Sequence, residues 1–250
     1  MRRYWFSPEN KQEDKIYLRG DLFHHVVGVC RQKVGSCFEM FTDGGRAYFV
    51  ELQEVGKKQA IAKILEGRQI PELRKPYIHL AVSVPRFAKM DIIVEKAVEL
   101  GVYELHPFVS DFSFVGKVDG RLQGRFLRWH KIVQGATQQS GRGDLMSLAA
   151  PTGLEELLDN FNRRTRALGL FPYEGEALQD LCQALGPLKG READEIWAFV
   201  GSEGGYSERE VQLFQSFSLQ PVTLGSQVLR VETACLALVS ILKYEWDLMK

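Results

Sequence analysis

A glycine-rich segment in the last quarter of the chain has the residue types of a ligand-binding loop. Residues 196–200 (IWAFV) form a short apolar run, and 201–205 (GSEGG) follow it directly. Ser207 and Glu210 stand three residues apart, as in a capping box, and predict that a helix begins there. Glycines at the carboxyl end of a strand let a ligand approach the backbone, and open α/β sheets bind ligands at that edge. A tight turn that binds nothing is the alternative.

A second loop of the same kind precedes the last predicted helix. Residues 222–224 are β-prone, 225–230 (GSQVLR) form the loop, and an apolar helical periodicity begins at Val231. Arg230 therefore lies at a helix N-terminus, where a cation is unfavourable unless an anion or another partner compensates it. An ion pair with Glu232 is one such compensation, and a bound ligand is another. Two loops at strand ends, close in the sequence, predict one shared pocket.

The third group of residues is basic. Arg121, Arg125 and Arg128 fall at helical spacing on one face of a predicted helix. Such a face can contact nucleic-acid phosphates without reading their sequence, and a solvated surface without a partner is the alternative. The chain has 32 basic and 32 acidic residues, yet residues 1–150 carry a net charge of +6 and residues 151–250 carry −6. This asymmetry favours a polyanionic partner for the first 150 residues.

Composition and residue spacing exclude several classes of protein. The 250 residues are 45% hydrophobic and 26% charged, which is typical of a globular chain with one or two domains. The cysteines lie far apart, without a C-x-x-C pair, and no histidine stands at metal-ligand spacing, so we expect neither a zinc site nor a disulfide scaffold. The N-terminus has no apolar signal segment, and no apolar stretch is long enough to cross a bilayer. The sequence therefore predicts a cytoplasmic protein with no metal and no membrane partner.

Two hydrophobic patterns divide the chain. Residues 1–70 are β-rich, with β-prone runs on both sides of a hairpin signal at 43–45 (DGG) and one helical turn at 24–30, so a small barrel or sandwich is the expected closure. Residues 71–76 are the predicted linker. From 77 to 250 short apolar strands alternate with amphipathic helices, which predicts an α/β domain on a mostly parallel sheet. The predicted strands are 37–42, 47–52, 59–65, 78–84, 103–108, 145–149, 166–171, 195–200 and 219–224, and the predicted helices are 90–98, 122–138, 154–161, 177–185, 207–215 and 231–246.

Several segments together resemble one family. Residues 199–207 (FVGSEGGYS) are similar to its glycine-rich loop I-G-P-E-G-G-F-S, and 224–234 (LGSQVLRVETA) to its motif L-G-x-x-I-L-R-x-E-T-A. Residues 96–102 and 139–142 match its helix and its glutamine–serine–arginine segment, and 2–6 and 24–31 resemble its front domain. Over essentially its whole length the chain resembles the 16S ribosomal RNA uridine N3-methyltransferases of the SPOUT superfamily.

The resemblance implies a fold, a cofactor and partners. The fold would be α/β, an N-terminal PUA-like β-barrel followed by a SPOUT α/β domain with a C-terminal trefoil knot. The partners would be 16S ribosomal RNA, within the small ribosomal subunit, and a second copy of the chain in a homodimer. The family binds S-adenosylmethionine in its knot loops, which correspond here to Leu170, Phe171, Pro172, Gly201, Ser202, Glu203, Gly204, Gly205, Leu224, Gly225, Ser226, Val228, Leu229 and Thr233.

The implied reaction assigns roles to charged side chains. Uracil N3 carries a proton, so its methylation needs a proton acceptor and positive groups near O2 or O4, where negative charge develops. Arg230 and Arg142 are the candidates for the positive groups. Glu203 or Glu232 would accept the proton, and the sequence does not decide between them. The alternative for either carboxylate is that it only orients an arginine or caps a helix. The candidate RNA-binding residues are Arg2, Arg3, Arg19, Arg31, Arg121, Arg125 and Arg128.

Two positions depart from the family pattern, and three other functions compete. Ser202 stands where the family usually has proline, and Gln227 where it often has arginine or lysine, which weakens the expectation of an RNA contact at 227. A nucleotide-dependent oxidoreductase would also use glycine loops, but no G-x-G-x-x-G with a downstream acidic residue is present. The other two competitors are a SPOUT methyltransferase acting on a tRNA ribose 2′-hydroxyl and a non-catalytic RNA-binding module.

Overall fold

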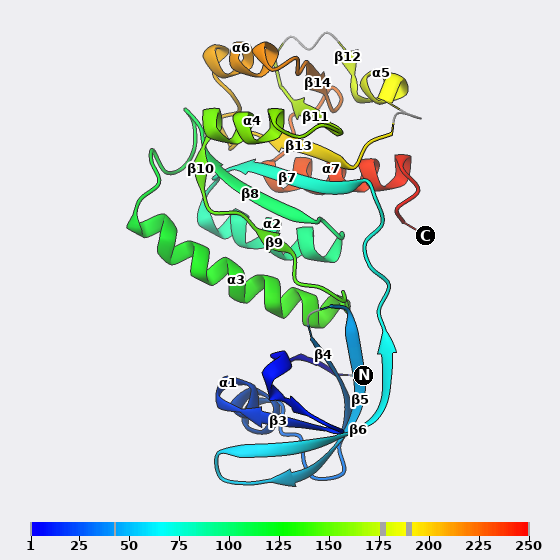
Figure 1. Cartoon of the computed structure of the whole chain (residues 1–250). Helices are drawn as coiled ribbons and strands as arrows, with labels where there is room; N and C mark the ends of the chain where they lie inside the picture. Colours follow the sequence, from blue (N-terminus) through cyan, green and yellow to red (C-terminus); the bar gives the residue numbers. More distant parts are fainter. Residues whose placement is uncertain (1, 43, 176–178, 189–191, 250) are drawn as a thin grey trace. The chain divides into compact units, whose positions relative to one another are not determined.

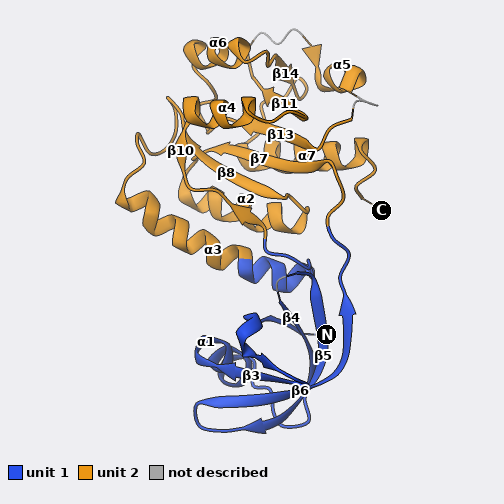
Figure 2. Ribbon diagram, viewed as in Figure 1, with its two compact units in different colours: residues 1–72, 134–145 blue, residues 73–133, 146–250 orange. Residues whose placement is uncertain are grey.

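The chain folds into two compact units. The computed structural model describes residues 2–42, 44–175, 179–188 and 192–249 (Figure 1). Unit 1 comprises residues 1–72 and 134–145, and unit 2 comprises residues 73–133 and 146–250 (Figure 2). Helix α3 (Gly120–Ser140) has residues in both units, so the chain returns to unit 1 after leaving it. Within the described residues, none of the helices has the length and apolar character that a membrane span needs.

Unit 1 is built on a curled sheet with the strand order β1-β4-β5-β6-β3-β2. All neighbours are antiparallel except β1 and β4. Register shifts where β5 pairs with β6 bend these two long strands, since a bulge increases local twist. The strands are β1 (Arg3–Trp5), β2 (Lys11–Gln12), β3 (Lys15–Arg19), β4 (Cys37–Thr42), β5 (Arg46–Val55) and β6 (Gln59–Gln69).

The sheet of unit 1 is a curled half-barrel, whereas the residue pattern predicts a small barrel or sandwich. The strands at its two ends are β1, with three residues, and β2, with two, so neither offers a ladder long enough to close the sheet. Helix α1 (Gly20–Phe23) leads into a π-helix at His24–Val29, which supplies Val26 to the core, where it packs with Phe38 and Leu52. The predicted hairpin is confirmed by the pairing of β4 with β5. A 3₁₀ turn, Pro8–Asn10, lies between β1 and β2.

In the described residues, unit 2 contains an eight-stranded sheet whose pairs are all parallel, and the sequence predicts a mostly parallel sheet. Seven strands follow the order β10-β8-β7-β13-β11-β14-β12, and β9 pairs with β8. Because the strands are parallel, their carboxyl ends lie at one edge of the sheet. The strands are β7 (Tyr77–Ser83), β8 (Glu104–Val109), β9 (Ser147–Leu148), β10 (Thr152–Gly153), β11 (Ala167–Pro172), β12 (Gln179–Asp180), β13 (Glu195–Val200) and β14 (Pro221–Thr223).

Helices cover both faces of this sheet (Figure 1). Helices α4 (Leu154–Asn162) and α6 (Glu208–Ser216) bury Phe161 and Phe214 against Phe199 of β13 on one face. Helices α2 (Phe87–Glu99) and α7 (Val231–Glu245) pack against each other, and α7 also contacts β7 and β13. The side chains of β13 alternate between the two faces, so the strand is buried on both.

Helix starts and ends agree with the sequence prediction at α6 and differ at α5 (Leu181–Leu185). The capping box of α6 is confirmed, because the side chains of Ser207 and Glu210 each accept the other's backbone N–H. The helix predicted at 177–185 begins only at Leu181. The side chain of Asp180 accepts the N–H of Gln183 as an N-cap, so Asp180 itself stays extended in β12; residues 177 and 178 lie outside the described residues. A 3₁₀ turn, Gly186–Leu188, follows α5.

Candidate functional site

A cavity of about 580 Å³ opens in unit 2 at the carboxyl ends of β13, β11 and β14. The loops that follow these strands supply most of its wall, since the three strands are neighbours in the sheet. The volume lies within the range of about 300–1,000 Å³ that is usual for small-molecule sites. The cavity is lined by residues 172–175, 200–206 and 223–231, together with Lys89 and Ala234.

The glycine-rich loop after β13 folds tightly against its neighbours. A Cβ on Gly201 would lie 3.1 Å from the backbone of Gly205, and a Cβ on Gly204 would lie 2.8 Å from the Cβ of Phe112. Ser202, the residue that departs from the family's proline, donates its hydroxyl to the carbonyl of Phe112 at 2.5 Å. Any side chain at position 201 or 204 would therefore displace the loop. The hydrogen bond of Ser202 connects the loop to the segment after β8.

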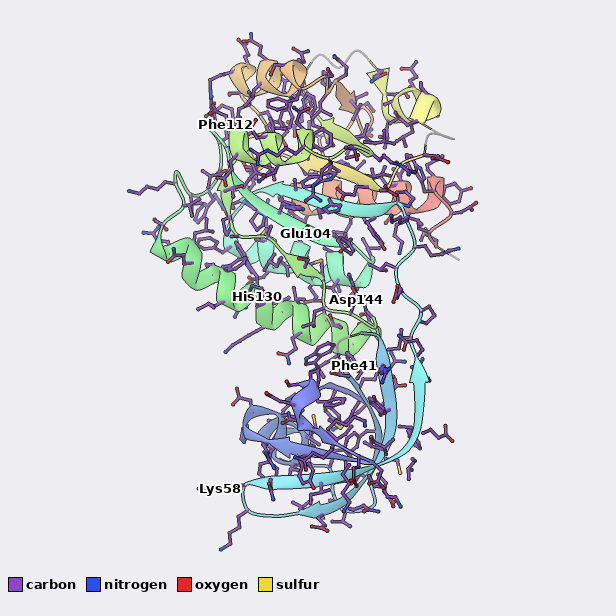
Figure 3. The ribbon with its side chains drawn as sticks, in the orientation of Figure 1. Phe41, Lys58, Glu104, Phe112, His130 and Asp144 are labelled. Atoms are coloured by element: carbon purple, nitrogen blue, oxygen red, sulfur yellow. The ribbon has the colours of Figure 1, made fainter. Side chains whose placement is uncertain are left out.

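That segment after β8 is also fastened to the start of α6. The backbone N–H of Asp111 donates to the buried Glu210 carboxylate at 2.8 Å, and Ser207 donates its hydroxyl to the carboxylate of Asp111. Hydrogen bonds from Arg209 and Ser207 lower the pKa of Asp111. The ring of Phe112 is half exposed beside the glycine-rich loop (Figure 3). The start of α6 thus holds the segment after β8 by hydrogen bonds, and this segment in turn contacts the glycine-rich loop.

Arg230 occupies the N-cap position of α7 and lines the cavity. Its own side chain makes no ion pair in the described part of the chain, and Glu232 contacts Lys89 instead. The alternative in which Glu232 neutralises Arg230 is therefore wrong. A cation at this helix start remains available to a ligand that enters the cavity.

Lys89, in the first turn of α2, contacts both candidate carboxylates. Its Nζ lies 3.4 Å from Oε1 of Glu203 and 3.6 Å from Oε2 of Glu232. The backbone N–H of Arg86 also donates to Glu203, at 3.3 Å. Glu203 lines the cavity, whereas Glu232 lines a separate groove between α2 and α7. Its Oε2 is buried and has no hydrogen-bond partner among the described residues.

Sequence reasoning missed Lys89. The signal was its place just after β7, whose carboxyl end lies at the same edge of the sheet as those of β11, β13 and β14. Tyr173 and Tyr206 also line the cavity without having been predicted. Burial raises the pKa of the Tyr206 hydroxyl well above its usual value, with Glu210 adding to the shift, so this hydroxyl stays a hydrogen-bond donor. Burial likewise raises the pKa of the Cys235 thiol on α7.

Three of the residues expected to bind the cofactor do not line the cavity. Leu170 and Phe171 are buried in β11, and Phe171 packs in the core of unit 2. Thr233 lines the groove between α2 and α7 together with Glu232. The others surround the cavity, namely Pro172, Gly201, Ser202, Glu203, Gly204, Gly205, Leu224, Gly225, Ser226, Val228 and Leu229.

Arg142 belongs to unit 1, whereas Arg230 belongs to unit 2. The guanidinium of Arg142 contacts both oxygens of the Asp144 carboxylate, at 3.2 and 2.9 Å, and its side chain is almost fully buried. Asp144 is half exposed (Figure 3). A bidentate pair fixes the plane of the guanidinium, so Arg142 is a rigid group two residues after the end of α3.

The arginines expected to contact RNA have different surroundings. On unit 1, Arg3 pairs with Glu39 at 2.9 Å, Arg2 donates to the carbonyl of Cys30, and Arg19 and Arg31 are exposed. On α3, Arg121 is exposed, Arg125 lies over the ring of Phe87, and Arg128 pairs with Asp91 at 2.9 Å. Asp91 also accepts the indole N–H of the buried Trp129, so Arg128 takes part in packing α3 onto α2.

Two family models match the chain. An RNA methyltransferase domain matches residues 72–243, and an RNA methyltransferase PUA domain matches residues 18–65. Together they account for both the parallel α/β unit and the curled sheet.

Individual relatives extend this similarity to the whole chain. A protein of Aquifex aeolicus named ribosomal RNA small subunit methyltransferase E is 32% identical over 239 residues, which cover 95% of this chain and 97% of that protein. A Bacillus subtilis protein of the same name is 25% identical over 259 residues, covering 100% and 99%. The crystal structure of a ribosomal RNA small subunit methyltransferase E from Neisseria gonorrhoeae, bound to S-adenosyl methionine, has a TM-score of 0.83 at 29% identity and covers 98% of this chain and 97% of its own.

Proposed function

Because the chain belongs to the family of RNA methyltransferases called ribosomal RNA small subunit methyltransferase E, we propose that it methylates N3 of a uridine in 16S ribosomal RNA with S-adenosylmethionine as the methyl donor. The observation that carries the proposal is the cavity at the ends of β13, β11 and β14, which joins the glycine-rich loop to Arg230. The Neisseria gonorrhoeae relative, which binds S-adenosyl methionine, supports the choice of cofactor.

The residues around the cavity fit S-adenosylmethionine. The close backbone approach at Gly201 leaves main-chain groups to line the cavity, and Leu224, Val228 and Leu229 offer apolar surface for an adenine ring. The hydroxyl of Tyr206 is buried without a hydrogen-bond partner in the described part of the chain. Loops 201–205 and 224–229 would hold the cofactor, which supplies an electrophilic methyl group when bound.

The reaction also needs a proton acceptor and a positive group, and the charged side chains near the cavity are the candidates for these two roles. Glu203 lines the cavity and Glu232 does not, so Glu203 is the better candidate to take the proton from uracil N3. Lys89 holds Glu203 in position and offsets part of the charge of both carboxylates. Arg230 would stabilise the negative charge that develops on O2 or O4 as the N3 proton leaves and before N3 takes the methyl group from the sulfonium of the cofactor. Arg142 is a second candidate for that role, as a preoriented guanidinium on unit 1.

Unit 1 and the basic face of α3 would hold the RNA substrate. The PUA domain match and the exposed Arg19 and Arg31 support this role for unit 1. Arg121 and Arg125 support it for α3, and Arg2, Arg3 and Arg128 would contribute by exchanging their present partners for phosphates. The substrate form we propose is the small ribosomal subunit, and the reaction would then take place in the cytoplasm, where ribosomes are assembled.

We also propose that the chain forms a homodimer with a trefoil-knotted C-terminal segment. The groove between α2 and α7 is lined by Ile92, Leu236 and Ala237, and its apolar side chains support a helix-to-helix interface. The strand order β13-β11-β14, out of chain order, supports the knot. After β14 the chain forms α7, which packs against β7 and β13, as a threaded C-terminal segment would.

The test is methyl transfer from labelled S-adenosylmethionine to small ribosomal subunits that lack the modification. Deproteinised 16S RNA and bulk tRNA serve as parallel substrates, and mass spectrometry identifies the modified nucleoside. We expect N3-methyluridine in ribosomal RNA, with subunits preferred over free RNA. A ribose-methylated tRNA product would overturn the substrate assignment, and RNA binding that is indifferent to S-adenosylmethionine would overturn the enzymatic assignment.

A further inference from the structure

Two histidines and a glutamate converge on one face of the sheet in unit 2, near the amino-terminal ends of β7 and β8. Nδ1 of His79 lies 3.0 Å from Nε2 of His106, and Oε2 of Glu104 lies 3.6 Å and 3.5 Å from these two atoms. The register of the sheet produces this arrangement, since Glu104 pairs with His79 and His106 pairs with Ala81, two residues further on. Neighbouring strands and the period of two thus bring all three side chains to the same face.

The spacing of the three atoms suits a metal ion. A tetrahedral zinc ion bonds nitrogen and oxygen ligands at about 2.0–2.1 Å, which places the ligand atoms about 3.4 Å from one another. The distances in the cluster lie on both sides of that value and require only small side-chain adjustments. His79 is 1% exposed and His106 7%, so neither nitrogen can turn to bulk water without disrupting the sheet. The side chain of Glu104, labelled in Figure 3, is partly exposed, so this ligand is the one of the three that solvent reaches most readily.

A second observation concerns the other ring nitrogen of His79. Its Nε2 is buried without a hydrogen-bond partner in the described part of the chain, and the nearest acidic atom is Oε2 of Glu195, 3.6 Å away. That carboxylate is held by the indole N–H of Trp197 at 2.9 Å and by Arg164 at 3.1 Å. A histidine that binds a metal through one nitrogen usually donates the N–H of the other to a carboxylate. Glu195 is placed for that role.

Trp197 also restrains both imidazole rings. Its ring stacks on His79 with centroids 4.5 Å apart and on His106 with centroids 4.3 Å apart. Ligands whose orientation is fixed before binding lose less conformational entropy when the ion arrives. The cluster therefore has three ligand atoms, an orienting carboxylate and a rigid aromatic support.

We propose that His79, His106 and Glu104 bind one divalent transition-metal ion, zinc by the nature of the donors, with a water molecule as the fourth ligand. Two imidazoles and one carboxylate are a donor set that zinc accepts readily. The ion would link β7 to β8 and stabilise unit 2. It takes no part in methyl transfer, because Trp197 precedes Gly201 by four residues of β13, or about 13 Å along the strand. The proposal is independent of the proposed function.

The experiment titrates metal-free, untagged full-length protein with zinc chloride by calorimetry and with cobalt chloride by visible absorption. We expect one equivalent to bind, with the intense cobalt bands of a four-coordinate site. His106→Asn and Glu104→Gln should abolish this binding, and Glu195→Gln should weaken it by about 10–100-fold. The matched control is His130→Asn, because His130 is exposed on α3, outside the cluster, and this variant should bind like the unaltered protein (Figure 3).

Some substitutions could perturb folding as well as metal binding. Measuring the Tm of each variant with and without zinc separates the two effects. Glu104→Gln preserves the size of the side chain and an oxygen to accept the hydroxyl of Ser147, so it should fold without metal. Zinc should raise the Tm of the unaltered protein and of His130→Asn, and leave that of Glu104→Gln unchanged. If the unaltered protein binds zinc no better than His106→Asn and Glu104→Gln, the cluster is only a hydrogen-bonded histidine pair and the proposal is wrong.

Discussion

At the scale of single residues, Arg230 is the side chain whose position bears most directly on the proposed reaction. It caps α7 without an acidic partner in the described residues and lines the cavity. We expect Arg230→Ala to lower the methyl-transfer rate by about 100-fold, since removing one preorganised donor to a developing oxyanion costs about that much. Cofactor affinity should change far less.

Single-turnover kinetics and calorimetry with S-adenosylmethionine separate the two effects. Arg230→Lys keeps the charge but loses the planar donor fork, and should recover only part of the rate. Normal turnover combined with weak cofactor binding would contradict this role for Arg230.

Lys89 is the residue that connects the two carboxylates beside the cavity. Replacing it by methionine leaves the buried Oε2 of Glu232 without its cation, which should lower the free energy of unfolding by about 1 kcal/mol and slow methyl transfer. Urea unfolding and turnover measure the two effects. Lys96→Met is the matched control, because Lys96 lies on the same helix but pairs with Glu95 and Glu99 away from the cavity. If Lys89→Met and Lys96→Met change the free energy of unfolding and the turnover rate equally, Lys89 has no specific role in the site.

At the scale of elements, the glycine-rich loop depends on its contact with the segment after β8. A methyl group at 204 would lie 2.8 Å from the Cβ of Phe112, so Gly204→Ala should shift the loop and reduce cofactor affinity at least tenfold. Calorimetry with S-adenosylmethionine measures the loss. Phe112→Gly in the same chain should restore part of it, since the clash is then removed.

The control for this prediction is Gly135→Ala in α3, where nothing lies within 4 Å of the added atom. That change should leave cofactor binding unaltered and stabilise the helix by about 0.5–1 kcal/mol. Unchanged binding in Gly204→Ala would mean that the loop tolerates displacement.

Helix α3 presents arginines that differ in how freely they can meet a phosphate. Arg121 is exposed and Arg125 lies over the ring of Phe87, with no ion pair in the described part of the chain, whereas Arg128 pairs with Asp91. We expect the double change Arg121→Ala and Arg125→Ala to weaken RNA binding and to reduce the salt slope of the binding constant by about 1.4–1.8. Arg163→Ala, an exposed arginine after α4, is the control. A salt slope equal to that of the control would exclude α3 from the RNA interface.

At the scale of the whole molecule, the groove between α2 and α7 bears on assembly. Ile92 is 48% exposed there, which is unusual for an isoleucine beside other apolar groove residues. If the groove is the dimer interface, Ile92→Glu should convert a dimer into a monomer in light-scattering measurements. Leu127→Glu, on the exposed side of α3, should leave the dimer intact. A monomeric unaltered protein would contradict the proposed interface.

Much of the fold follows from local patterns. The alternation of apolar strands and amphipathic helices predicted the parallel sheet of unit 2, and the β-prone runs around 43–45 predicted the β4–β5 hairpin. Both depend on neighbouring residues, whose side-chain period reports secondary structure directly. The open edge of the half-barrel and the late start of α5 were not predicted, because each depends on strand length or capping that only the folded chain reveals.

The sequence by itself determined most helices and the longer strands of unit 2, the glycine-rich loop and its capping box, and the loop that leads into Arg230, because each lies within one short segment. The short strands β1, β2, β3, β10 and β12 were not predicted. Only the tertiary structure decided that Lys89 meets Glu203 and Glu232, that residues 134–145 belong with unit 1, and that His79 lies against His106 and Glu104. The sequence predicted no metal site, since these histidines are 27 residues apart. Their proximity arises from the pairing of β7 with β8, and local spacing carries no information about which strands become neighbours.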